Sequence, residues 1–216
     1  MNSIVKAYIR LIMSERFSDI SSKPDAPFLG ASFAIGGLCN TSDAVFGNVA
    51  FKDGEAIPAF TAYMTELEKM KRFGFTEGEV KRATDNLLSS YEKAVEAAST
   101  RKNGDLVRPL LNNFYDNTPY MEPETELMIG KQICSMMTAP MLSQVVAQII
   151  PEDNLIILYN GPEKEGLTNP TKQELLSVMK TVSEADIQAN IEEVLNEPLV
   201  SEELKGSPVK KTNEGI

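Results

Sequence analysis

The fold is decided by residues 27–101, which contain FLGASFAIGGL (28–38) and DAVFGNVAFK (43–52) followed by a long amphipathic stretch. The two quoted segments are apolar, β-prone and glycine-rich, and CNTS (39–42) between them is rich in turn formers. We therefore predict two strands joined by a turn. Two helices should follow and separate at Gly74, because glycine favours the end of a helix.

Both predicted helices carry apolar side chains at steps of three and four residues, the spacing of one face of an α-helix. The second helix opens with Thr76 and Glu79, a capping box in which each side chain reaches the backbone N–H of the other. The apolar positions of the two helices are Ile57, Phe60, Met64, Leu67, Met70 and Phe73, then Val80, Ala83, Leu87 and Tyr91.

The junction RFGFTEGEVKR (72–82) resembles a passage of the insulinase/pitrilysin-type zinc metallopeptidases, the inverzincins. Supporting motifs occur in the same order in SERFSDI (14–20), PFLGA (27–31) and NLIILYNGP (154–162), so that the resemblance covers residues 3–162. The resemblance implies that this chain corresponds to the domain that follows the metal-binding domain in those enzymes. The expected fold class is α+β: a mixed, mainly antiparallel sheet with helices mainly on one face, lacking its first strand.

Bulk properties are those of a globular protein with room for a core. The 216 residues are 42% hydrophobic and 24% charged, with a net charge of −10. Because nucleic acids and anionic membranes need clustered Lys and Arg, we expect neither as a partner. No apolar run approaches the roughly 20 residues that span a bilayer, and no basic segment with an apolar core opens the chain.

The predicted domain organisation has three parts. Residues 1–162 form the inverzincin-type domain, 163–196 a helical extension, and 197–216 a polar linker toward a missing second half. The domain opens on an amphipathic helix over 2–22, and the family places a strand before it. We therefore expect the chain to begin inside a larger polypeptide.

The second half of the domain is predicted as helices over 105–115, 122–137 and from Thr138, followed by a strand at 154–159. That strand is almost wholly apolar, which is typical of an interior strand covered on both faces. In the extension, Thr171 and Glu174 form a second capping box, for a helix over 174–180, and a further acidic helix covers 183–195.

The chain contains no histidine. The zinc site of the inverzincins needs His-x-x-Glu-His on a helix, so none of those ligands can come from this chain. Serine–histidine and cysteine–histidine nucleophiles are excluded for the same reason. We expect no catalytic, cofactor-binding or metal residue here, and zinc in the preceding domain of the parent.

Other candidate chemistry favours ordinary structural roles. The acid pairs Glu66/Glu68, Glu92/Glu96 and Glu192/Glu193 lie among charges opposite the apolar faces, which favours a solvated surface over acid/base catalysis. Methionines at helical spacing favour core filling. The strand glycines favour tight helix packing over the addition of a peptide strand. The methionines concerned are Met64, Met70, Met128, Met136, Met137, Met141 and Met179.

Two further points stay open. Cys39 and Cys134 could form one disulfide, although two thiols are favoured. Arg108 and Tyr115 have the spacing of a substrate-gripping Arg/Tyr pair, but they are not at the position of the family motif and are not assigned that role.

The sequence thus predicts a non-catalytic fragment of a zinc metalloendopeptidase that forms part of a peptide-enclosing chamber. Its expected partners are the remaining domains of the parent, a peptide substrate and a second copy that pairs through an exposed sheet edge. The alternative is a structural or interaction module of a zinc-free homologue of the core-subunit type. Related bacterial enzymes point to the periplasm or cell envelope, and the sequence itself fixes no compartment.

Overall fold

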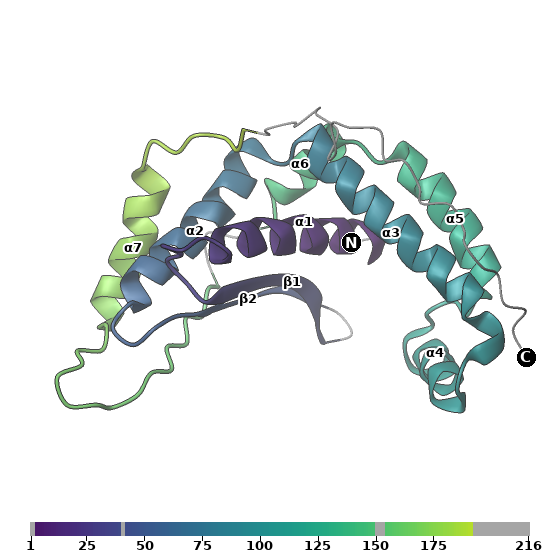
Figure 1. Cartoon of the computed structure of the whole chain (residues 1–216), viewed down its shortest axis with the longest axis horizontal. Helices are drawn as coiled ribbons and strands as arrows, with labels where there is room; N and C mark the ends of the chain where they lie inside the picture. Colours follow the sequence, from purple (N-terminus) through teal and green to yellow (C-terminus); the bar gives the residue numbers. More distant parts are fainter. Residues whose placement is uncertain (1–2, 40–41, 150–153, 192–216) are drawn as a thin grey trace, which may run out of the picture.

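The computed structural model describes residues 3–39, 42–149 and 154–191. Figure 1 shows an arch of helices over a small sheet, with α1 running between them. The elements are α1 (Ser3–Ser21), β1 (Gly30–Cys39), β2 (Ser42–Ala50), α2 (Ala56–Phe73), α3 (Glu77–Glu96), the 3-10 helix η1 (Ala98–Thr100), α4 (Asn103–Asp116), α5 (Pro123–Met136), α6 (Ala139–Val146) and α7 (Lys172–Glu184).

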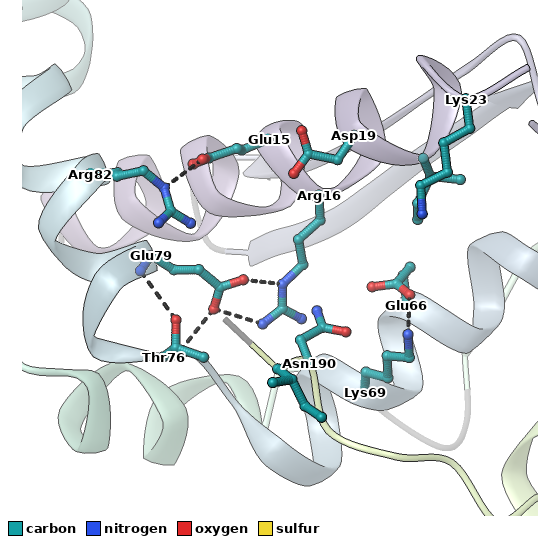
Figure 2. A pocket seen from close by; sticks show the side chains of 12 residues that line it. Glu15, Arg16, Asp19, Lys23, Glu66, Lys69, Thr76, Glu79, Arg82 and Asn190 are labelled. Carbon is teal, nitrogen blue, oxygen red and sulfur yellow. Dashed lines mark hydrogen bonds and ion pairs between the residues drawn. The ribbon is translucent and has the colours of Figure 1, made fainter. Parts of the chain in front are cut away.

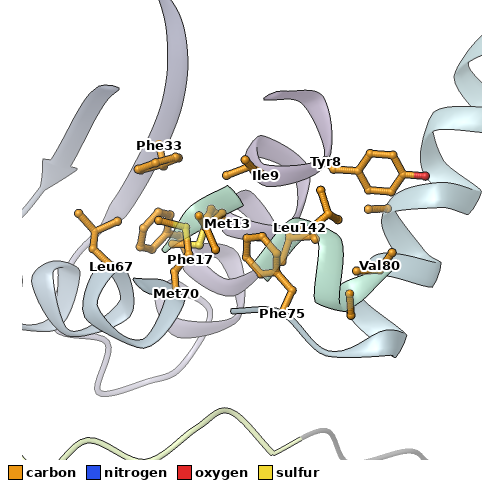
Figure 3. Close-up of a cluster of buried hydrophobic side chains, with 14 of the residues drawn as sticks. Tyr8, Ile9, Met13, Phe17, Phe33, Leu67, Met70, Phe75, Val80 and Leu142 are labelled. Carbon is orange, nitrogen blue, oxygen red and sulfur yellow. The ribbon is translucent and has the colours of Figure 1, made fainter. Parts of the chain in front are cut away.

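Helix α1 is the centre of the core and packs against β1, α3 and α6. Its inward side chains Tyr8, Ile9, Ile12, Met13 and Phe17 are at most 1% exposed. Figure 3 shows them surrounded by residues from the sheet and from α2, α3 and α6. The amphipathic helix predicted at 2–22 is therefore present, and it is buried more deeply than any other element.

The sheet is one antiparallel pair in which Gly30 lies opposite Ala50 and Phe33 opposite Gly47. Alternate residues of the strands face α1 and α2, with Phe33 only 3% exposed, and Figure 1 shows the arch of helices over one side of the pair. The predicted α+β class and one-sided helix packing are confirmed. A Cβ at Gly47 would collide with the Tyr63 hydroxyl, so tight packing explains this glycine.

The interior strand predicted at 154–159 is wrong. Residues 155–160 form no strand, and Ile156 and Leu158 are each 90% exposed. An apolar run becomes an interior strand only beside a strand that accepts its hydrogen bonds, and among the described residues β1 and β2 pair only with each other. The segment touches the sheet region through Tyr159, whose ring stacks on Phe51 with centroids 5.9 Å apart.

The break between α2 and α3 occurs at Gly74, as predicted. Gly74 has φ of 67°, and a Cβ there would collide with Ser143 of α6. The Ser143 hydroxyl accepts the backbone N–H of Phe75 at 3.1 Å. The Thr76/Glu79 capping box at the start of α3 is confirmed, and so is the Thr138 cap of α6. The junction is therefore tied to α6 as well as capped.

Burial of several apolar residues differs from the prediction. The α2 stripe keeps Leu67 and Met70 but is otherwise displaced toward Ala59 and Tyr63, and Phe73 is 44% exposed. Three of the methionines assigned to the core are more than half exposed, namely Met128, Met136 and Met141. Their spacing is helical, but their faces of α5 and α6 point away from the described core, which spacing alone does not reveal.

Helix α4 buries none of its residues and lies at the end of the arch, away from the sheet (Figure 1). We call its apolar side chains the outlying apolar surface. It consists of Val107, Leu110, Leu111, Phe114 and Tyr115, which are 48–76% exposed. The exposed side chains Leu155, Ile156 and Leu158 form a separate apolar segment beside the sheet. None of the helices in the described part of the chain is long and apolar enough to cross a membrane.

In the extension, α7 packs on α2 and the capping box of Thr171 and Glu174 is confirmed. The helix runs to Glu184, beyond the predicted 174–180. The separate helix predicted at 183–195 is wrong over 185–191, because that segment is irregular. Arg72 of α2 donates to the backbone oxygens of Ser183 and Ala185, which fixes the end of α7. The remainder of that helix and the linker at 197–216 lie outside the described residues.

Candidate functional site

A buried ion pair joins α1 to the start of α3. The Arg16 guanidinium donates to both carboxylate oxygens of Glu79, at 2.6 and 2.9 Å, and to the backbone oxygen of Gly74 at 2.9 Å. Arg16 and Glu79 are each 7% exposed. This bidentate geometry holds the α2–α3 junction against the central helix, and the Arg16 guanidinium also lies over the Phe75 ring.

Glu79 is held in its ionised form. Burial by itself would raise the pKa of this carboxyl, but the hydrogen bonds and charge of Arg16, with two bonds from Thr76, outweigh burial and lower the pKa below its usual value. The Thr76 backbone N–H donates to Glu79 at 2.8 Å, and the Glu79 N–H donates to the Thr76 hydroxyl. The carboxylate therefore serves as a cap and as an ion-pair partner at once.

Beside this pair lies a cavity of about 470 Å³ between α1, α2 and the start of α3, closed on one side by the segment after α7. Figure 2 shows the charged side chains that surround it. Four cations and four anions line the cavity, so it is polar and electrically balanced. The charged residues are Glu15, Arg16, Asp19, Lys23, Glu66, Lys69, Glu79 and Arg82.

Most of these charges are already paired. Glu66 is only 5% exposed and accepts from Lys69 at 2.7 Å, and Arg82 donates to Glu15 at 2.6 Å. The predicted solvated position of Glu66 is therefore wrong, because its face of α2 turns toward α1 and the cavity. One donor is left over: the Arg16 Nη1 is buried and has no hydrogen-bond partner.

The other carboxylates considered from the sequence do not join this site. Glu68 pairs with Arg72 at 2.6 Å, and Glu92 is 53% exposed beside Lys131. Glu96 is exposed at the end of α3. Glu192 and Glu193 lie outside the described residues. None of the described pairs assembles two carboxylates around a cavity as acid/base catalysis would need.

The remaining candidates are scattered as well. Arg108 and Tyr115 are both exposed on α4, far from the cavity. Cys39 is an exposed thiol at the end of β1, whereas Cys134 is a buried thiol in α5. Within the described residues no three His, Cys, Asp or Glu side chains are grouped so as to hold a metal ion. Of the groups named above, those beside Arg16 are the ones that the described structure gathers around a cavity, and we take that cavity as the candidate site.

The sequence contained a signal for this site that was not recognised. Arg16 falls three and four residues after the buried Met13 and Ile12, on the apolar face of α1. A charged residue on such a face needs a partner when it is buried. The spacing of Thr76 and Glu79 predicts only a capping role for Glu79. Arg16 and Glu79 are 63 residues apart along the chain, so no local pattern predicts that they pair.

In fold, the chain is similar to parts of known proteases. It matches the first half of the periplasmic protease PqqL from Escherichia coli with a TM-score of 0.71 and 16% identity, covering 87% of this chain and 40% of that one. It also matches part of the full-length PqqL chain with a TM-score of 0.72 and 17% identity, covering 92% of this chain and 22% of that one. The chain also matches a mutant of the ferredoxin protease FusC, solved in complex with Arabidopsis ferredoxin. That match has a TM-score of 0.55 and 14% identity, and it covers 88% of this chain and 21% of that one.

These matches confirm, for the fold, the resemblance to insulinase-like proteases that the motifs indicated. The chain spans about a fifth of the length of the complete PqqL and FusC chains. No family model matches the sequence, and a search of curated proteins gives no match. The likeness is one of backbone architecture, because identity is below 20% throughout.

Proposed function

We propose that this chain is a non-catalytic domain of a larger insulinase-type zinc metalloendopeptidase and forms part of the chamber that encloses the peptide. The observation that carries the proposal is the match of 87% of the chain to the first half of a periplasmic protease at a TM-score of 0.71. A chain without histidine cannot supply the His-x-x-Glu-His ligands, so the zinc would be held by another domain. A bacterial periplasm is the proposed compartment.

The role of such a domain is confinement. A wall that holds an extended peptide near zinc lowers the entropic cost of the attack without taking part in the chemistry. The outer edges of β1 and β2 support this role, because the two strands pair only with each other among the described residues. A peptide strand added to one edge would gain main-chain hydrogen bonds. The same edge could instead pair with a second copy of the chain.

The remaining domains of the parent are the proposed partners of the outlying apolar surface and of the separate apolar segment 155–158. Phe114 is 76% exposed and Ile156 is 90% exposed, which is unfavourable in water for side chains of this size. Coverage by neighbouring domains removes that cost. It would also supply a strand beside 155–159, the element that the segment lacks here.

The most direct test is the coding sequence upstream of this chain. A His-x-x-Glu-His within about 200 residues, roughly one domain length, supports the protease. Its absence favours the zinc-free structural module. The purified chain should retain no stoichiometric zinc after dialysis and should cleave no peptide. One zinc per chain, or hydrolysis by the isolated chain, contradicts the proposal.

A second test addresses the partner surface. Co-expression with the preceding domain should give a complex that co-purifies by size exclusion. Phe114→Asp should weaken that association, whereas Lys81→Asp on the exposed side of α3 should leave it unchanged. If both variants associate with the preceding domain equally well, the outlying apolar surface is not part of the interface.

A further inference from the structure

The cavity beside Arg16 has a donor and two charges that the protein does not use. The Arg16 Nη1 is shielded from water and has no acceptor, although the side chain is only 7% exposed. Such a buried donor is costly to leave without a partner, and it is normally satisfied by protein, water or ligand. Nε and Nη2 are engaged by Glu79 and Gly74, and Figure 2 shows the other end of the guanidinium facing Asn190 of the cavity wall.

The unused charges lie on and just after α1. Arg16 and Asp19 are three residues apart, a spacing that puts them on one side of the helix, and Lys23 lines the same cavity from the turn that follows the helix. Within the described residues the Asp19 carboxylate and the Lys23 ammonium make no ion pair. Both are exposed at the rim, so the cavity has a cationic donor at its floor and one charge of each sign at its mouth.

We infer that this cavity binds a small zwitterion with a free α-carboxylate and a free α-ammonium, of the size of an amino acid to a dipeptide. The carboxylate accepts from Arg16 Nη1 and from Lys23, and the ammonium pairs with Asp19. A volume of about 470 Å³ falls within the range of small-molecule sites. The charge balance of the wall disfavours a ligand with a large net charge.

The side chain of Asn190 occupies the position that we assign to the ligand carboxylate. Figure 2 shows its side-chain amide facing the Arg16 guanidinium, and no hydrogen bond joins the two in the described structure. The ligand carboxylate would replace this amide beside Nη1. Asn190→Ala is therefore expected to leave binding intact or to strengthen it. This inference does not depend on the proposed protease function, because it uses only the groups that line the cavity.

The test is calorimetric titration of the full chain with alanine, Ala-Ala, Ala-Ala amide and N-acetyl-Ala-Ala. Ala-Ala should bind with one site per chain, and amidation should weaken it at least tenfold. Alanine and Ala-Ala distinguish a free amino acid from a peptide as the preferred ligand. The inference is overturned if neither alanine nor Ala-Ala gives a heat change at ligand concentrations from 10-fold the protein concentration up to millimolar levels.

Variants separate the proposed contacts. Arg16→Lys should weaken Ala-Ala at least tenfold, and Lys23→Ala about threefold. In Asp19→Asn, acetylation of the dipeptide should have no further effect, because the partner of the ammonium is gone. Lys81→Ala is the matched control and should bind as the wild type does. If Arg16→Lys does not fold, Lys23→Ala and Asp19→Asn decide: unchanged affinity in both overturns the inference.

Discussion

The region around α1 and the outlying apolar surface both carry apolar side chains on helices, but those around α1 are buried and those of the outlying apolar surface are exposed. Phe17 of α1 is 1% exposed and stacks on Tyr63 with ring centroids 5.2 Å apart. Phe114 of α4 is 76% exposed and contacts the ring of its own neighbour Tyr115. Amphipathic periodicity therefore makes a helix in both places, and only in the first do other elements cover its apolar face.

This contrast locates the stability of the described chain. The α1 region should unfold as one cooperative unit, because the sheet and helices α2, α3 and α6 contribute to one buried cluster. The outlying apolar surface contributes little to that unit and is the part that depends on a partner. The predictions below test this division, beginning with the largest expected effect.

Replacing the two phenylalanines compares the regions directly. Phe17→Ala should lower the free energy of unfolding by about 3–5 kcal/mol, because it leaves a cavity between α1 and the ring of Tyr63. Phe114→Ala should change it by less than about 0.5 kcal/mol. Urea denaturation followed by circular dichroism measures both. Comparable losses at the two positions would show that α4 is part of the same packed core.

The buried ion pair gives the next contrast. Glu79→Gln leaves the Arg16 charge without its partner and should cost about 3 kcal/mol of unfolding free energy. Glu92→Gln, on the exposed pair with Lys131, should cost less than about 1 kcal/mol. Both are measured by urea denaturation at pH 7. A small loss of stability in Glu79→Gln would mean that another group compensates the charge of Arg16.

Acid should weaken the α1 region through the same carboxylate. Because folding lowers the pKa of Glu79, its contribution is complete above the unfolded pKa of about 4.3 and is lost as the pH falls through the lower folded value. The difference in stability between wild type and Glu79→Gln should therefore narrow below about pH 4.3. Urea midpoints of both proteins from pH 6 down to pH 3 give the curve, and a constant difference contradicts the assignment.

The smallest effect compares two capping boxes of the same design. Thr76→Ala removes the cap of α3 and should cost about 1 kcal/mol, because the backbone N–H of Glu79 loses the Thr76 hydroxyl as its acceptor within the core region. Thr171→Ala removes the equivalent cap of the peripheral helix α7 and should have a smaller effect on global unfolding. Amide exchange should instead show local fraying at the start of α7. A larger loss of global stability for Thr171→Ala than for Thr76→Ala would place α7 within the cooperative unit.

Sequence patterns predicted local elements well and their environments poorly. Helix α1, the strand pair, the break at Gly74 and the capping boxes follow from side-chain spacing and from backbone geometry, which are local properties. The failures at 154–159, at Glu66 and at Met128 all concern what lies opposite a residue. Periodicity indicates that a face is apolar, but it does not indicate whether another element covers that face.

The sequence by itself determined the strand pair and the helices up to α6, and, through the absence of histidine, that this chain cannot supply the zinc ligands of the proteases it resembles in fold. Only the tertiary structure brought Arg16 to Glu79 across 63 residues and left one guanidinium nitrogen without an acceptor beside a polar cavity. The physical reason is that hydrogen bonding and burial depend on distances in space, which spacing along the chain does not encode between separate elements.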